Sequence, residues 1–301
     1  MTMPSRITLW EAGARDGLQN EPGVVPTDVK LELLDRLADC GLTHMEATSF
    51  VSPKWVPQMG DAAEVMTRLK RAPGVTYQVL TPNEKGYEAA KQYGASAIAV
   101  FAAASESFSK RNLNCTIEES LERFRPVVER GKADGKRVRG FVSVALGCPF
   151  EGDLDPKQVA KLCKQVADLG CDDIGIGDTI GVGTPGKVKA LLEEVAQYMP
   201  LDRVGMHFHD TYGQALANTL ASLEMGITAH DASVAGLGGC PYAPGATGNL
   251  ATEDLVYMLD GMGIESGVDI KKLVRTAWWI SEKLGREPVS RVAKALKSKV
   301  M

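Results

Sequence analysis

The sequence predicts a closed (β/α)8 TIM barrel with an extra helix and a tail at its C-terminal end. Strand-like and helix-like segments alternate eight times along the 301 residues, with short connections between them. The strands are mostly apolar runs, which is typical of parallel strands covered on both faces. No G-x-G-x-x-G motif follows the first strand, so an open dinucleotide-binding sheet is less favoured. We expect one domain over residues 1–301, with the barrel at about 5–260 and the helical extension at about 261–301.

Apolar segments bounded by turn residues give the eight strands. They are 7–11, 44–48, 76–80, 97–102, 138–145, 173–177, 205–210 and 230–234. The first strand is followed by a glycine-rich turn over 13–17, and a loop that contains Lys110 and Arg111 is expected after the fourth.

Capping residues and helical periodicity place the helices. Thr27 is expected to cap the first helix, which ends at Gly41. The segments 81–84 and 116–119 have the pattern of capping boxes, the first with proline at the first helical position. Further helices are expected at about 58–70, 116–131, 155–170, 184–198, 214–225, 249–259 and 270–284, with a basic tail behind them.

Composition favours a globular cytoplasmic protein that binds neither nucleic acid nor membrane. Hydrophobic residues make up 44% of the chain, which is enough for a sizeable core. The net charge of −4 gives no electrostatic reason to bind nucleic acid or an anionic membrane. We find no apolar run near roughly 18 residues, and the first residues lack the features of a signal or transit peptide.

The six cysteines are expected to remain thiols. None belongs to a C-x-x-C motif, and a long chain in a reducing compartment does not need disulfides. Cys40 and Cys163 fall in helical patterns and are expected in the core, whereas Cys115, Cys148 and Cys240 fall in predicted loops.

Two of the four histidines, His207 and His209, lie at the end of the seventh predicted strand. Alternating residues of a strand point to the same face, so the two imidazoles lie about 7 Å apart and are able to share one metal ion. Seen alone, the H-x-H pattern fits a pair of hydrogen-bonded core histidines equally well.

The other strand ends decide between these alternatives, because active sites of (β/α)8 barrels form at the C-terminal ends of their strands. Each polar residue there, taken singly, fits a surface loop position, and Asp178 also fits a helix or turn cap. As a set they are unlike a chance scatter. The set comprises Arg15, Asp16, Gln19, Glu46, Asp178, His207, His209, Asp210, Cys240 and Asn249.

Within this set, Asp16, Asn249 and the two histidines offer mixed nitrogen and oxygen ligands. Such ligands suit Mg²⁺ or Mn²⁺, and Zn²⁺ or Co²⁺ also bind them. Arg15 is adjacent to Asp16, so it would direct a fixed cation at an oxygen that gains negative charge.

The loop over 236–249 is glycine-rich and longer than a typical connection in such a barrel, which indicates a lid. Cys240 lies in this loop. A thiol carried on a lid over a metal site is a candidate acid or base, although a loop cysteine also often has no role.

Six segments of the chain match the motifs of one enzyme family. They are ARDGLQNE (14–21), TSFVSPKWVPQMGD (48–61), ALGCPFEGD (145–153), GDTIGVGTPG (177–186), HFHDTYGQALANTL (207–220) and VAGLGGCPYAPGATGNLATEDLVYML (234–259). Through these segments the chain resembles the 3-hydroxy-3-methylglutaryl-CoA lyase family of metal-dependent lyase and condensing-enzyme barrels. The resemblance implies that Asp16, His207, His209 and Asn249 bind a divalent metal, Mg²⁺ or Mn²⁺.

The resemblance also implies catalytic roles for Arg15, Cys240, Glu46, Asp178 and His207, and it implies a homodimer. The expected reaction is cleavage of 3-hydroxy-3-methylglutaryl-CoA to acetoacetate and acetyl-CoA. The base and the acid remain open among Cys240, Asp16, Asp178 and His207.

An acyl-CoA substrate brings phosphates to the barrel mouth. Lys110 and Arg111 are candidate phosphate contacts or simply a solvated basic loop, and Arg15 and Gln19 are candidate substrate contacts. Three rival functions remain: a lyase for a longer 3-hydroxy-3-alkylglutaryl-CoA, a condensing enzyme for acetyl-CoA and an α-keto acid, and a non-catalytic barrel that binds metal or CoA.

Overall fold

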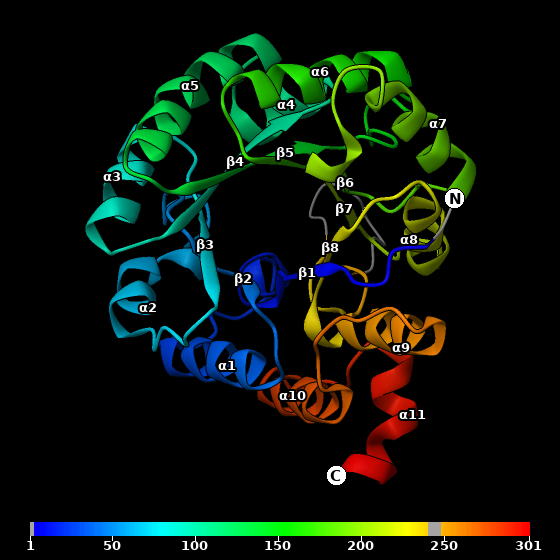
Figure 1. Ribbon diagram of the computed structural model, residues 1–301. Coiled ribbons are helices and arrows are strands. Elements are labelled where there is room, and N and C mark those ends of the chain that lie inside the picture. The colour runs from blue at the N-terminus through cyan, green and yellow to red at the C-terminus, as the bar shows by residue number, and fades with distance from the viewer. Residues whose placement is uncertain (1–2, 240–247) are drawn as a thin grey trace.

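The computed structural model describes residues 3–239 and 248–301, and its centre is a closed barrel of eight parallel strands (Figure 1). Each strand pairs with the next along the chain, and the first pairs with the last to close the ring. The predicted fold class is therefore confirmed. The strands are β1 Thr8–Glu11, β2 His44–Ser49, β3 Thr76–Leu80, β4 Ala97–Ala103, β5 Arg137–Ser143, β6 Asp173–Asp178, β7 Val204–Phe208 and β8 Ala229–Ala232.

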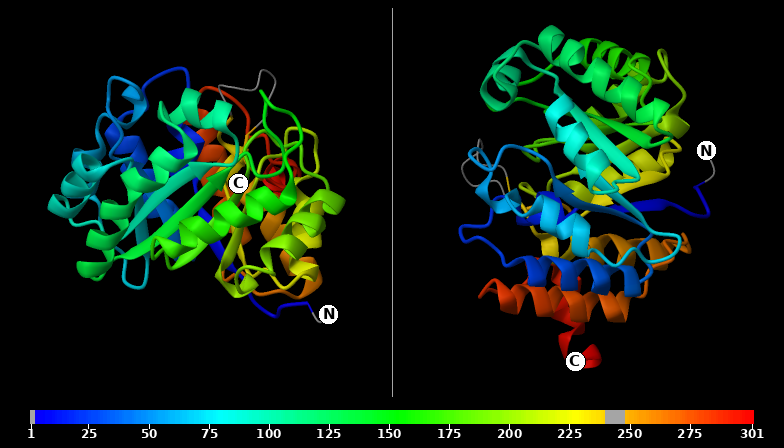
Figure 2. Two further views of the ribbon diagram at one scale, coloured as in Figure 1. Left: turned by 90° about the horizontal axis from the view of Figure 1, so that it is seen from above. Right: turned by 90° about the vertical axis from the view of Figure 1, so that its left-hand side faces the viewer.

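Helices cover the outside of this ring, and α10 lies beside α1 where the barrel closes (Figure 2). The last helix, α11, packs against α9 and α10. The helices are α1 Thr27–Asp39, α2 Ala62–Arg68, α3 Glu84–Gln92, α4 Glu106–Leu113, α5 Ile117–Ala133, α6 Pro156–Asp168, α7 Pro185–Val195, α8 Ala215–Glu224, α9 Thr252–Met262, α10 Ile270–Lys283 and α11 Arg291–Val300. Among the helices in the described ranges, none is both long and apolar enough to cross a lipid bilayer.

The two faces of the strands have different surroundings. The outward faces pack with the helices into one extended apolar cluster, to which Val138, Val166 and Leu192 belong. The inward side holds larger and more polar groups. Trp10 and Arg139 are both almost completely buried there, with the guanidinium carbon 4.7 Å from the indole centroid.

Two predicted helix caps are wrong, because tertiary contacts engage the residues that were expected to cap. Thr27 lies inside α1, and its hydroxyl donates to Asp61 at 2.8 Å. The Thr81 hydroxyl donates to the Ala99 carbonyl at 2.9 Å, and Asn83 caps α3 instead. The second capping box is confirmed: Thr116 and the third residue of α5 exchange two hydrogen bonds.

Three segments also differ from the prediction in extent. The expected loop after β4 contains the short polar helix α4, which Ser105 caps. The expected helix at 58–70 is divided into a 3₁₀ turn, Pro57–Met59, and the shorter α2. The basic tail forms α11. These segments are short or highly charged, so periodicity gives little signal for them.

Candidate active site

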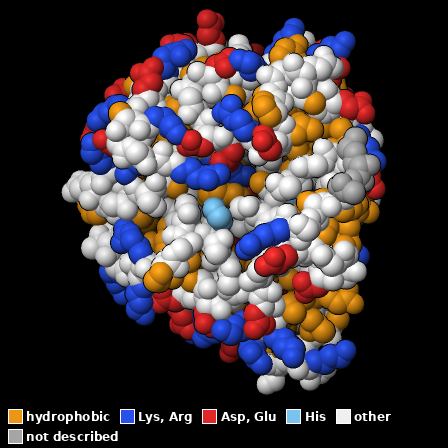
Figure 3. All heavy atoms as spheres, in the orientation of Figure 1, with side chains coloured by type: hydrophobic (Ala, Val, Ile, Leu, Met, Phe, Trp, Pro, Cys, Tyr) orange, Lys and Arg blue, Asp and Glu red, His pale blue; other side chains and the backbone are white. Residues whose placement is uncertain are grey.

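The C-terminal ends of the strands surround a cavity of about 960 Å³. Figure 3 shows this hollow with a histidine side chain at its centre and Lys and Arg side chains at its edge. The predicted site residues that line the cavity are Arg15, Asp16, Gln19, Lys110, Arg111, His207 and His209.

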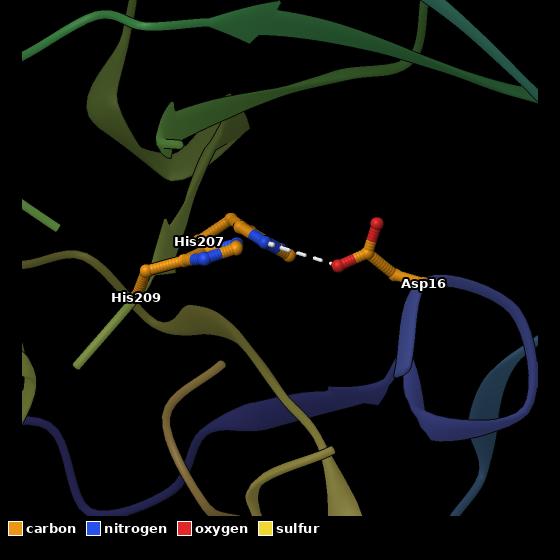
Figure 4. Close-up of side chains that lie close together, drawn as sticks. All are labelled: Asp16, His207 and His209. Atoms are coloured by element: carbon orange, nitrogen blue, oxygen red, sulfur yellow. Dashed lines mark ion pairs between the residues drawn. The ribbon is translucent and has the colours of Figure 1, made fainter. Parts of the chain in front are cut away.

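Asp16, His207 and His209 form a compact cluster at the base of the cavity (Figure 4). One ligand atom from each lies within 4.8 Å of the others. The two rings come from the end of β7, with centroids 5.3 Å apart. Asp16 approaches from the π-helical turn Gly13–Gly17 that follows β1, and its Oδ2 is 3.9 Å from His207 Nε2. The two rings share one face, as predicted, but at 5.3 Å they lie closer together than the expected separation of about 7 Å.

Asn249 joins the cluster through backbone pairing with the end of β7. An isolated bridge sets Asn249 opposite His209, and the Asn249 amide donates to Asp16 Oδ2 at 2.9 Å. Two buried atoms, Asn249 Oδ1 and His209 Nδ1, have no hydrogen-bond partner among the described residues. Buried polar atoms are normally paired, so this arrangement fits a cation bound between the four side chains.

The electrostatics of the cluster also favour cation binding. Burial would raise the pKa of Asp16, but the charges of Arg15, His207 and His209 outweigh it and hold that pKa below its usual value. Burial and the neighbouring His207 lower the pKa of His209 to about 4. Near neutral pH the site therefore offers an ionised carboxylate and a neutral imidazole, the forms that bind metal.

Arg15 is held between two carboxylates. Its Nε donates to Glu46 at 2.7 Å, and its Nη1 donates to Asp16 at 2.8 Å. Gln78 donates to the other oxygen of Glu46 at 3.0 Å. Glu46 does not line the cavity, so its contacts place it behind Arg15 as an orienting group.

The glycines of the turn that carries Arg15 and Asp16 permit its close packing. A Cβ on Gly13 would lie 2.6 Å from a carboxylate oxygen of Glu11, and a Cβ on Gly17 would lie 2.7 Å from the Ser233 hydroxyl. The turn therefore fits between β1 and β8 only without side chains at these two positions.

Asp178 lies at the end of β6 with both carboxylate oxygens bound to backbone. They accept from Val182 N at 3.1 Å and Gly183 N at 2.9 Å. Burial raises the pKa of Asp178 to about 6 although these hydrogen bonds oppose the shift. These contacts favour a role for Asp178 as a cap of the turn that follows β6 over a role as an active-site carboxylate.

The remaining predicted residues lie at the rim or outside the described ranges. Lys110 and Arg111 occupy the last turn of α4, and the Arg111 guanidinium lies 4.2 Å from the Phe150 ring centroid. The Asp210 carboxylate caps the start of α8 by accepting from Ala215 N. Cys240 lies outside the described residues.

Four charged residues beneath the site escaped the prediction. Asp231 on β8 lies next to His207, and Arg139 on β5 lies inside the barrel, where it pairs with Asp231. Glu11 accepts from Gly13, Val234 and Thr252, and Glu253 accepts from Ala235. The sequence offered one signal for two of them: Arg139 and Asp231 are charged residues inside apolar strands. Such residues are rarely buried without a partner, so the pattern indicates a buried ion pair.

Comparisons with known proteins agree with this geometry. The model of the HMGL-like family matches residues 6–280. The chain belongs to the HMGL-like family. It is 55% identical over 294 residues to the mitochondrial hydroxymethylglutaryl-CoA lyase of Bos taurus, covering 98% of this chain and 90% of that protein. The corresponding human protein is 54% identical with the same coverage.

Solved structures of this family have the same fold. Hydroxymethylglutaryl-CoA lyase from Pseudomonas aeruginosa superposes with a TM-score of 0.97 at 53% identity, covering 99% of this chain and 100% of that one. An HMG-CoA lyase from Acinetobacter baumannii, in complex with coenzyme A and 3-methylmalate, has a TM-score of 0.93 at 37% identity and covers 98% and 97% of the two chains.

The buried carboxyl of Glu253 predicts a pH-dependent stability. Burial raises its pKa from 4.5 to about 8, so the folded chain binds this proton more tightly than the unfolded chain. The resulting stabilisation is complete below about pH 4.5 and is lost as the pH rises through about 8. Glu253→Gln keeps an acceptor for Ala235 N and cannot ionise.

Urea unfolding from pH 5 to 9 should therefore show the stability of Glu253→Gln, relative to the unsubstituted protein, increasing with pH. Glu118→Gln on the exposed side of α5 is the control and should show no such trend. A constant difference between Glu253→Gln and the unsubstituted protein across this range would contradict the interpretation.

Proposed function

We propose that the protein is a divalent-metal-dependent carbon–carbon lyase that cleaves 3-hydroxy-3-methylglutaryl-CoA to acetoacetate and acetyl-CoA. The observation that carries the proposal is the cluster of Asp16, His207 and His209 beside the Arg15 guanidinium. It occurs in a chain 55% identical to a hydroxymethylglutaryl-CoA lyase over nearly its whole length.

The metal ligands of this proposal are Asp16, His207, His209 and Asn249. Mg²⁺ or Mn²⁺ suits this set of two imidazoles and two oxygens. When bound, such a cation lowers the pKa of the substrate hydroxyl and polarises its oxygens. The chain itself contributes the fixed geometry of the ligands, since β7 and the turn after β1 hold them before any ligand arrives.

Arg15 is the group that stabilises the negative charge left on the thioester oxygen when the C2–C3 bond breaks. Its position within the cavity wall, between Glu46 and Asp16, directs a preorganised guanidinium into the cavity that substrate would fill. Fixed charges in such a space stabilise developing charge without reorganisation. Glu46 acts through Arg15 by orienting it.

Proton transfer needs a group that is able to give up and accept a proton near the substrate. Among the candidates, Asp178 has both oxygens bound to backbone and lies outside the cavity wall. Cys240 is the family's loop thiol by resemblance, and we propose it as the acid or base.

The CoA portion of the substrate meets the basic rim of the cavity. Lys110 and Arg111 face the same cavity as Arg15 and Gln19, although they come from a different strand–helix unit. A related lyase binds coenzyme A in its solved structure. Phosphate groups at this rim would be held by charge-assisted hydrogen bonds.

Assembly and location are further proposals. We infer that the barrel and its C-terminal helices act as one domain in a homodimer, which light scattering of the purified protein would test. The described cysteines are free thiols, in keeping with a reducing compartment such as the cytoplasm. The Bos taurus and human relatives are named as mitochondrial.

The direct test is incubation of the metal-loaded protein with 3-hydroxy-3-methylglutaryl-CoA. Acetoacetate and acetyl-CoA should form in equal amounts, and chelation of the metal should stop the reaction until Mn²⁺ or Mg²⁺ is returned. Cleavage without metal, or formation of no acetoacetate from the loaded protein, would contradict the proposal.

Arg15→Gln should lower kcat by about 100- to 1,000-fold, because the variant loses the fixed charge at the thioester oxygen. Mn²⁺ affinity should change only a few-fold, since Asn249 still donates to Asp16. Arg203→Gln removes an arginine that binds backbone carbonyls at the opposite end of β7, and it should keep near-normal kcat. Near-normal turnover by Arg15→Gln would refute the assigned role.

The double substitution Lys110→Gln and Arg111→Gln should raise KM for the CoA thioester several-fold and leave kcat nearly unchanged. Each exposed charge contributes up to about 1 kcal/mol to the binding free energy of the CoA thioester. The control double variant, Lys187→Gln and Lys189→Gln, removes two charges from α7 outside the cavity. Equal KM values for both double variants would show that the rim charges do not contact CoA.

A further inference from the structure

A line of buried charges runs through the barrel beneath the candidate metal site. Arg139 from β5 pairs with Asp173 on β6 at 2.9 Å and with Asp231 on β8 at 2.8 Å. The other oxygen of Asp231 lies 3.2 Å from Nδ1 of His207 on β7. Arg139 is completely buried and Asp231 is 2% exposed. The line ends at a ligand of the candidate metal site.

The register of the strands explains two of these contacts. Arg139 is paired with Asp173 across β5 and β6, and His207 is paired with Asp231 across β7 and β8. Residues paired in neighbouring strands point to the same face, so their side chains meet inside the barrel. The contact between Arg139 and Asp231 is different, because it spans two intervening strands.

Small residues make room for this longer reach. Gly175, Gly205 and Ala229 are side by side in the registers of β6, β7 and β8. A Cβ on Gly205 would lie 2.6 Å from Arg139 Nη2, so any side chain there would displace the guanidinium. A Cβ on Gly175 would likewise meet the Phe141 ring at 2.5 Å, and Arg139 packs on that ring.

The chemistry of the Asp231 contact fixes the hydrogen on His207. An ionised carboxylate only accepts hydrogen bonds, so Nδ1 of His207 must carry the proton. In the neutral ring, Nε2 then has its lone pair free, and it is the nitrogen that faces Asp16 at 3.9 Å. In proteins, a carboxylate behind a metal-binding histidine sets the ring orientation and raises its strength as a ligand.

We propose that Asp231 is a positioning residue that holds the His207 ring ready for the cation, and that Arg139 holds Asp231 in place. This inference rests on the metal site of the proposed function. A buried carboxylate without a partner is strongly unfavourable, and the ion pair with Arg139 removes that penalty. Both ring nitrogens of His207 are then engaged, so His207 serves as a ligand and transfers no proton.

Two substitutions test the proposal by different routes. Asp231→Asn keeps the shape but removes the charge behind His207. Gly205→Ala removes no polar group and instead pushes Arg139 away from Asp231. Gly140→Ala is the matched control, because its Cβ would be equally crowded, 2.4 Å from Val166, but on the outer face of β5 against α6.

The primary readout is Mn²⁺ affinity, measured from the electron paramagnetic resonance signal of free Mn²⁺ without substrate. Asp231→Asn should weaken binding by about 10- to 100-fold, with a smaller loss for Gly205→Ala and a change below about twofold for Gly140→Ala. Lyase activity of Asp231→Asn should recover as Mn²⁺ is raised. Thermal unfolding without metal reports whether each variant is folded.

The outcomes are separable. Unchanged Mn²⁺ affinity in folded Asp231→Asn would overturn the positioning role, as would equal losses for Gly205→Ala and Gly140→Ala. If Asp231→Asn does not fold, the Mn²⁺ affinities of Gly205→Ala and Gly140→Ala decide: a greater loss in Gly205→Ala supports the positioning role, and equal losses reject it. If the unsubstituted protein binds no Mn²⁺, the proposed metal site fails and this inference fails with it. If the unsubstituted protein binds Mn²⁺ but cleaves no substrate, the proposed reaction is rejected and the positioning role of Asp231 is still tested by the variants.

Discussion

The contact of Arg15 with Glu46 and Asp16 is the interaction on which the candidate site depends. It joins β2 to the turn after β1, and it places the guanidinium beside the cluster of candidate metal ligands. Each of these charges would be unfavourable if buried alone, so their mutual pairing allows all three at the base of the cavity. The same pairing sets the separation between the candidate cation ligand Asp16 and Arg15, the group proposed to stabilise the thioester oxygen. Geometry and electrostatics are thus fixed together before substrate binds.

Much of this arrangement is predictable because the repeating unit is simple. Eight alternations of strand and helix favour one closed ring, and a ring of parallel strands brings all their carboxyl ends to one side. His207 and His209 then share a face through the two-residue period of a strand. Asp16 and Asn249 are placed by the same logic, as residues that follow β1 and β8. The prediction needed only local periodicity and the order of the elements.

The wrong or missing parts depend on contacts across the barrel. Thr81 has the sequence of a capping residue, but a carbonyl on the neighbouring strand engages its hydroxyl. Arg139 reaches Asp231 because glycines, Gly175 and Gly205, occupy the facing positions of the two strands between them. No local sequence pattern predicts this ion pair, because it depends on the register of four strands. Asp178 shows the opposite case, in which a polar residue at a strand end is engaged by the backbone of its own turn.

The hydrogen bond between Asn249 and Asp16 joins residues that are 233 positions apart. Contacts of such separation form late, because the intervening chain must lose its freedom before they are made. During synthesis the ribosome releases Asp16 long before Asn249, because 233 positions separate them. A nascent chain therefore carries both histidines before it has all four of the proposed metal ligands. With the proposed ligand set, cation binding is acquired only at ring closure, so the ion would stabilise the finished barrel but would not guide its early assembly.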